Sequence, residues 1–158
     1  MSNRSFKVLV DYAEALVELT ERGQNAWTNQ VLNGTVLPRS QTGRRVIDFE
    51  LVLLDEEVVG LPALTDLLTL DGLRLATASE LRGFATHYLL VNRPAETIHA
   101  LGSAFFNEPD EYPEETGWFA EQLKIFADGS HDFQLESVLA RSGRLKWPVG
   151  TTILAVRE

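Results

Sequence analysis

The stretch from Gly72 to Tyr88, GLRLATASELRGFATHY, constrains the fold more than any other part of the chain. It predicts a short strand at 73–75 and then a helix, because Thr77 can cap the first turn and Glu80 can bond back to the amide of the cap. Apolar residues follow at helical spacing, at Leu81, Phe84, Ala85 and Tyr88. We therefore assign Thr77 and Glu80 a structural role, at the start of a helix on which later strands pack.

The residues before this stretch carry the periodicities of two strands and two helices. Alternation of apolar and polar residues predicts strands at 6–10 and 44–54. Helical spacing of apolar residues predicts helices at 12–22 and 61–70. Residues 24–43 are rich in turn formers and are expected to form a loop.

The residues after this stretch read mainly as strands. Residues 105–118 are acidic and without a period, so we expect an irregular loop there. Asp128-Gly129 marks the turn of a hairpin, because glycine takes the positive φ that such a turn needs. The predicted strands are 97–101, 123–127, 133–139 and 151–157.

Composition excludes several classes of function. Acidic residues outnumber basic ones, 23 to 14, and a net charge of −9 repels phosphate backbones, so we expect no nucleic-acid partner. The chain has no cysteine, which excludes a thiolate nucleophile, disulfides and sulfur metal ligands. No apolar run has the length of a membrane span or a signal peptide, so we expect a cytoplasmic protein without a membrane partner, with export by a route other than a classical signal as the alternative.

The order of three motifs resembles a family of uncharacterised bacterial proteins. RLATASELRGFATHY, IHALGSAFF and the closing ILAVRE are similar to the R-x-A-T-x-x-E-L, A-L-G-S and F-L-A-V-R motifs of that family. FKVLVDY near the start, with Trp27 downstream, extends the likeness over nearly the whole chain. No activity follows from this resemblance.

More distantly, the same order is similar to the C-type-lectin-like superfamily, which includes formylglycine-generating-enzyme-like proteins and the variable proteins of diversity-generating retroelements. Ala76 stands where that superfamily usually has proline, and the residues that match its helix-start motif are Arg74, Leu75, Thr77, Glu80 and Leu81. Formylglycine-generating enzymes work through cysteine chemistry, so their activity cannot be carried over to a chain without cysteine.

This second resemblance implies an α+β, C-type-lectin-like fold with two or three helices packed on a small, mostly antiparallel sheet. It implies a single domain over residues 1–158. Within it, residues 1–57 would form an N-terminal strand–helix–strand extension, and residues 58–158 would form the lectin-like core.

The acidic loop at 107–115, NEPDEYPEE, is the candidate metal site. Its carboxylates are hard oxygen ligands of the kind that Ca²⁺ prefers, and we assign Glu108, Asp110 and Glu115 to this role. Glu108-Pro109-Asp110 also resembles a loop of calcium-dependent sugar-binding lectins, but their Trp-Asn-Asp strand motif is missing. A solvated acidic loop is the simpler interpretation, so we expect no cofactor, with calcium as the alternative.

Aromatic residues and one histidine are the candidate ligand-binding residues, because exposed aromatic side chains anchor interfaces and form sugar platforms. Burial in the core is the alternative. We prefer burial for Phe119 and Phe133, and we weigh the two alternatives evenly for Tyr112 and Trp147. His87 and His99 fall on other predicted elements than the third histidine, so no shared metal site is implied. The assigned residues are Tyr112, Trp118, His131 and Trp147.

These observations favour a non-catalytic binding module over an enzyme. We expect a protein or glycan ligand to bind the surface formed by residues 105–119 and 128–150. The first alternative is a structural protein that assembles as a homo-oligomer through edge strands. The second is a metal-assisted hydrolase in which the carboxylates of the acidic loop act with His131.

Overall fold

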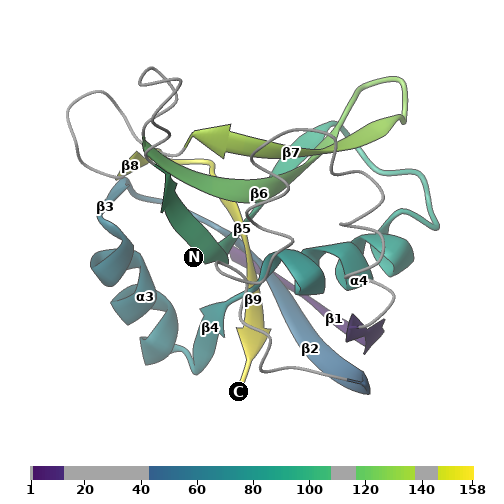
Figure 1. Ribbon diagram of the computed structural model, residues 1–158, viewed down its shortest axis with the longest axis horizontal. Coiled ribbons are helices and arrows are strands. Elements are labelled where there is room, and N and C mark those ends of the chain that lie inside the picture. Colours follow the sequence, from purple (N-terminus) through teal and green to yellow (C-terminus); the bar gives the residue numbers. More distant parts are fainter. Residues whose placement is uncertain (1, 13–42, 108–116, 138–145) are drawn as a thin grey trace.

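The computed structural model describes residues 2–12, 43–107, 117–137 and 146–158. Within these residues two helices pack on a curled, mostly antiparallel sheet, which confirms the expected α+β class (Figure 1). The elements are β1 (Ser2–Asp11), β2 (Arg44–Leu53), β3 (Val58–Val59), α3 (Leu61–Leu70), β4 (Leu73–Leu75), α4 (Ala78–Tyr88), β5 (Glu96–Asn107), β6 (Gly117–Ile125), β7 (His131–Ser137), β8 (Lys146–Trp147) and β9 (Thr152–Arg157).

The main sheet has the strand order β1-β2-β9-β5-β6-β7, and β4 also pairs with β9. Strand β9 therefore lies in the middle, with β2 along one side and with β5 and β4 sharing the other. The β5–β9 pair is parallel, with Ile98 opposite Thr152, whereas the other pairs of this sheet are antiparallel. Strands β3 and β8 form a separate small sheet.

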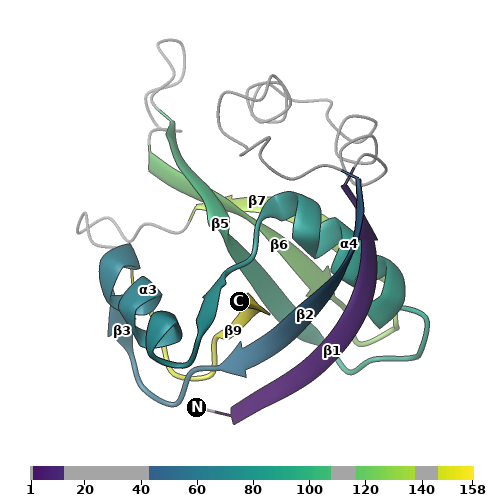
Figure 2. The ribbon, with the colours of Figure 1, turned by 90° about the horizontal axis from the view of Figure 1, so that it is seen from below.

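Alternation along β9 divides the interior into two hydrophobic cores. Leu154 and Val156 lie in the first core with the apolar face of α4, and the sheet curls around that helix (Figure 2). Ile153 and Ala155 point the other way, into the second core with α3. Because every residue from 152 to 156 is buried, this strand is apolar on both faces.

Helix α4 begins as the sequence predicts. The hydroxyl oxygen of Thr77 accepts a hydrogen bond from the Glu80 N–H at 3.3 Å, and the Glu80 carboxylate accepts one from the Thr77 N–H at 2.9 Å. The Ala78 N–H is bound by the hydroxyl oxygen of Ser103 at 3.0 Å. Three of the amides that a helix start leaves without helical partners are thereby satisfied.

The three motifs that carry the family resemblance meet at this helix start. Ala76 donates its N–H to the carbonyl of Leu154 at 3.1 Å, and its own carbonyl accepts the N–H of Gly102 at 2.8 Å. A Cβ on Gly102 would lie 2.7 Å from the Ala76 carbonyl oxygen, so only glycine fits this approach. The glycine and serine of the A-L-G-S motif thus have a structural explanation.

Several expectations need correction or lie outside the described residues. Residues 105–118 are not all irregular, because β5 continues to Asn107 and β6 begins at Gly117. Strand β2, in the segment expected as an N-terminal extension, bonds directly to β9 in the segment expected as the core. Beyond Tyr12, the helix expected at 12–22 falls outside the described residues, as does Trp27. Neither described helix is long and apolar enough to cross a membrane.

Thr77→Ala should lower the free energy of unfolding by about 1 kcal/mol, because the Glu80 amide loses its cap. Chemical denaturation measures this difference. Thr86→Ala is the matched control on the same helix, since its exposed hydroxyl bonds only a helical carbonyl among the described contacts, and it should change stability by less than about 0.5 kcal/mol. Equal losses in the two variants would contradict the cap.

Gly102→Ala should destabilise the fold by about 1–3 kcal/mol, because the obstacle to its Cβ is backbone that cannot rotate away. Gly83→Ala is the comparison. Its Cβ would meet the two side-chain methyl groups of Val10 at 2.6 and 2.9 Å, and alanine gains helix propensity there. We expect the larger loss of thermal stability for Gly102→Ala, and the reverse order would mean that the β5–β4 approach is looser than described.

Candidate functional site

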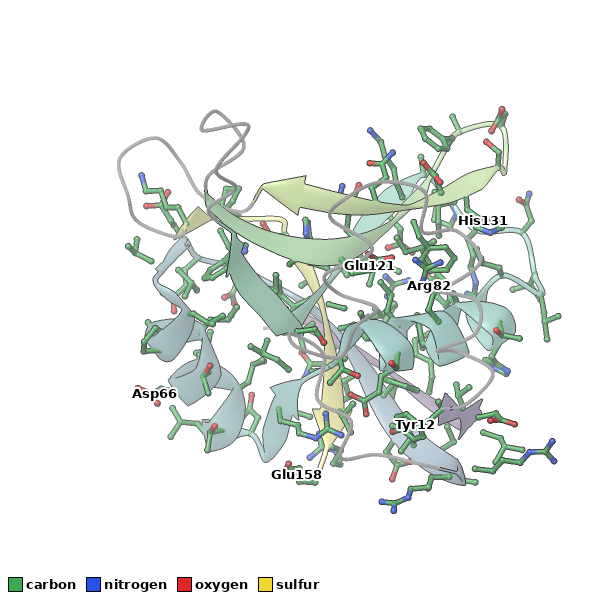
Figure 3. The ribbon with its side chains drawn as sticks, in the orientation of Figure 1. Tyr12, Asp66, Arg82, Glu121, His131 and Glu158 are labelled. Carbon is green, nitrogen blue, oxygen red and sulfur yellow. The ribbon has the colours of Figure 1, made fainter. Side chains whose placement is uncertain are left out.

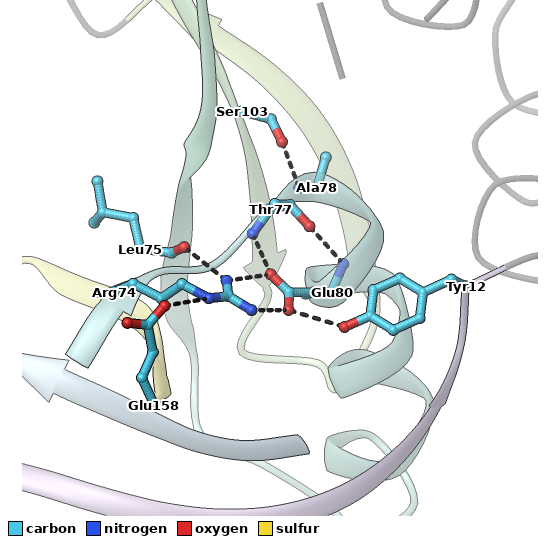
Figure 4. A network of polar contacts seen from close by, with 8 residues as sticks. All are labelled: Tyr12, Arg74, Leu75, Thr77, Ala78, Glu80, Ser103 and Glu158. Carbon is cyan, nitrogen blue, oxygen red and sulfur yellow. Dashed lines mark hydrogen bonds and ion pairs between the residues drawn. The ribbon is translucent and has the colours of Figure 1, made fainter. Parts of the chain in front are cut away.

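A buried carboxylate fixes the position of α4. Both oxygens of Glu80 accept hydrogen bonds from the Arg74 guanidinium, at 2.9 and 2.8 Å, and one also accepts the hydroxyl of Tyr12 at 3.0 Å (Figure 4). Arg74 belongs to β4 and Tyr12 directly follows β1. The network therefore ties the first turn of α4 to two strands, and Glu158 contacts the same guanidinium from the surface at 3.3 Å.

The charge state of Glu80 follows from these contacts. Burial by itself would raise the pKa of this carboxyl group, but hydrogen bonds from Arg74, from the Thr77 N–H and from Tyr12 hold its pKa below the ordinary value. Burial and the neighbouring carboxylate raise the pKa of Tyr12, so the phenol stays protonated and donates. The network has the features of a structural ion pair, since both carboxylate oxygens are occupied.

The other end of α4 is held by a second polar network. Arg4 on β1 donates to the hydroxyl of Tyr88 at 3.1 Å and to the carboxylate of Glu96 at 2.9 Å. The Tyr88 hydroxyl also donates to Glu96 at the start of β5. The Arg93 guanidinium lies 4.0 Å from the centroid of the Tyr88 ring and donates to the Tyr88 carbonyl. The chain that leaves α4 is thereby anchored.

A buried ion pair connects the middle of α4 to the hairpin of β6 and β7. Arg82 on α4 and Glu121 on β6 bond to each other, and their side chains are only 5% and 6% exposed (Figure 3). The Arg82 guanidinium lies 3.6 Å from the centroid of the Phe133 ring. That ring meets the exposed imidazole of His131 edge-to-face, with 5.9 Å between centroids. Contacts therefore run from a buried pair to a surface histidine.

The turn between β6 and β7 lies beside the connection between α4 and β5. Asp128 accepts hydrogen bonds from the amide and the hydroxyl of Ser130, which lower its pKa. A Cβ on Gly129 would lie 3.5 Å from the side-chain oxygen of Asn92, so the two connections touch. Large side chains are exposed on both, and we call them the hairpin-end surface: Leu90 at 78%, Val91 at 56%, Phe126 at 37%, and His131.

The structure separates the residues assigned to ligand binding. His131 is exposed at the start of β7. Trp147 is 3% exposed and packs in the second core. Of the two alternatives for this residue, burial is therefore correct, and its assignment to a surface binding site was wrong. Trp118 lies on β6, but its side chain is outside the described part. Tyr112 lies outside the described residues.

The candidate metal ligands Glu108, Asp110 and Glu115 also lie outside the described residues. In the part of the chain that the structure describes, no three carboxylates and histidines gather as a metal site would require. His87 lies exposed on α4, and burial in β5 lowers the pKa of His99. The two therefore have different surroundings from His131.

A hollow of about 370 Å³ opens on the face of β1 and β2 that is turned away from α4. Arg157 and Asn3 bond the buried carboxylate of Glu50 there, and Lys7 lies 3.2 Å from Asp48. Because these charges neutralise one another, the hollow presents no net charge to a ligand. We interpret its polar groups as supports of the sheet.

The residues that position the hairpin-end surface could not be assigned from a motif. Glu121 had one signal in the sequence. It is two positions before Leu123 and four before Ile125, so a strand would place its carboxylate on the same inward face as these two apolar residues. Arg82 sits beside the apolar stripe of its helix, where an arginine is ordinarily solvated. The pairing of the two depends on contacts 39 residues apart.

Comparison with protein-family models, with curated proteins and with solved structures gives no match for this chain.

Glu80→Gln should lower the free energy of unfolding by about 3 kcal/mol near neutral pH, because it removes one partner of a buried ion pair. The folded pKa of Glu80 lies below its ordinary 4.5, so ionisation stabilises the fold above pH 4.5 and this contribution is lost as pH falls through the folded pKa. The gap between wild type and variant should therefore narrow in acid. Denaturation at a series of pH values measures it.

Glu158→Gln is the control for this measurement, since it removes the exposed partner of the same arginine. A surface pair contributes at most about 1 kcal/mol, so this variant should stay close to wild type. A gap for Glu80→Gln that does not depend on pH would contradict the ionised state of Glu80.

Proposed function

We propose that this chain is a non-catalytic binding module that engages a protein or glycan ligand through the hairpin-end surface. The observation that carries the proposal is the exposure of three large apolar side chains on two touching connections, Leu90, Val91 and Phe126. Such grouped exposure is characteristic of interaction surfaces, whereas single exposed apolar residues are ordinary.

The contacts that hold this surface in place support the proposal. A binding loop gains affinity when it is held in place before the ligand arrives, because less conformational entropy is lost on binding. Arg93 anchors the connection after α4 to Tyr88, and Ser130 rigidifies the turn through Asp128. His131 is oriented by its edge-to-face contact with Phe133. The two connections that carry the exposed side chains are thus held in position by contacts with the rest of the fold.

A C-type-lectin-like fold is part of the same proposal. The order of the three motifs supports it, and so does the contact between them, since Ala76 bonds both Leu154 and Gly102. In that superfamily a rigid core presents ligand-binding loops and strands. Of the two ligand classes, we favour a protein, because Leu90 and Val91 are aliphatic and sugar platforms are aromatic.

The test begins with a glycan array and with cross-linking capture, followed by affinity measurement on whichever purified ligand binds. Leu90→Ser should weaken its affinity about tenfold, equivalent to about 1.4 kcal/mol. Leu70→Ser is the matched control, because Leu70 is 85% exposed at the end of α3 and belongs to the other helix. Equal affinities for the two variants would place the binding site elsewhere, and substrate turnover would contradict a non-catalytic role.

A further inference from the structure

Strand β1 lies at an edge of the main sheet. It is 10 residues long, and among the strands that the structure describes it pairs only with β2. Long edge strands are templates for pairing with another chain, and many proteins blunt them with proline or a bulge. The sequence SNRSFKVLVD contains no proline, and its register with β2 runs without a shift from Ser2 to Asp11. This edge carries neither of those two devices.

The hydrogen-bond phase of β1 shows which residues face outward along the edge. Tyr12 donates its N–H to the carbonyl of Gly43 at 3.1 Å, directly beyond the pair of Asp11 with Arg44. Bonded pairs alternate in an antiparallel ladder, so the even-numbered residues of β1 bond to β2. The odd-numbered residues, Lys7 and Leu9 among them, direct their N–H and C=O groups away from the sheet.

The side chains of these residues form three rows across β1 and β2, one apolar and two charged. Leu9 lies opposite Val46, and both are exposed, at 61% and 66%. Lys7 lies opposite Asp48 at 3.2 Å, and Asp11 lies opposite Arg44 at 3.0 Å. The strand is thus basic at Lys7, apolar at Leu9 and acidic at Asp11.

We propose that β1 pairs antiparallel with β1 of a second copy of this chain, with Leu9 on the two-fold axis. Leu9 then faces its own copy, and the apolar row becomes Val46, Leu9, Leu9 and Val46 across four strands. Lys7 faces Asp11 of the other copy, so each charged row reads Asp48, Lys7, Asp11 and Arg44. The signs alternate along the whole row, which is the complementarity that selects a second copy as the occupant.

Other antiparallel registers fit less well. A two-fold axis at Lys7 overlaps more residues, but it places two ammonium groups directly opposite each other, which is destabilising. An axis at Val8 places Lys7 opposite Leu9 and Ser5 opposite Asp11, so neither row is continuous. Of the registers compared, the one with Leu9 on the axis is therefore the one in which both the apolar row and the charged rows continue across all four strands.

Single cysteines test this register, because the chain has none of its own. Bonded pairs in an antiparallel sheet have Cα atoms about 5.5 Å apart, within disulfide range, so Leu9→Cys should form covalent dimers under mild oxidation. Val46→Cys is the matched control, since it is equally exposed on the next strand and lies about 14 Å from its copy, three strand spacings away. Equal cross-linking of the two variants, or none at Leu9→Cys, would overturn the proposal.

Sedimentation of the unmodified chain tests the dimer itself. We expect concentration-dependent dimers that weaken at high salt, because the charged rows are exposed. Leu9→Lys should weaken dimerisation at least tenfold, since it sets two ammonium groups on the axis, and Val46→Lys should weaken it less. A chain that stays monomeric at every concentration, or a dimer that tolerates Leu9→Lys, would overturn the proposal. Because Leu90 lies outside this edge, Leu90→Ser should leave the dimer unchanged and separate this result from ligand binding.

Discussion

The fold depends on a carboxylate that is buried and ionised. Glu80 has no exposed surface, and a lone charge in that position would cost several kcal/mol. Arg74, Tyr12 and the Thr77 amide offset this cost by occupying its oxygens. Since these partners come from β4, from the end of β1 and from the helix itself, ionisation of one group couples three parts of the chain.

The position of α4 then determines what the hairpin can present. With its first turn held by Glu80 and its last residue held by Arg4 and Glu96, the helix cannot slide along the curled sheet. Arg82 consequently reaches Glu121 and covers the ring of Phe133. Exposed side chains near the turn are therefore backed by a helix whose two ends are fixed, which is the arrangement that a preorganised surface requires.

Local signals in the sequence predicted local structure. Four features could be predicted in this way: the capping box, the helix at 61–70, the long second strand and the hairpin at Asp128-Gly129. Each depends on a cap, a period or a turn, and these act over a few residues. The parallel pairing of β5 with β9 could not be predicted from the sequence, since it joins residues more than 50 positions apart. Trp147 shows the same limit, because its burial depends on the second core and not on its neighbours in sequence.

The central place of β9 has a consequence for how the chain is made. Every other strand that the structure describes precedes β9 in the sequence, yet β9 fills the gap between β2 and β5 and closes both cores. A ribosome that has not yet released residues 152–157 holds a chain whose two half-sheets have no shared strand. Closure of the sheet therefore waits until residues 152–157 have emerged and depends on contacts that are distant in sequence. Until then the apolar flanks of β2 and β5 lack their partner strand and are exposed surface of the kind that chaperones bind.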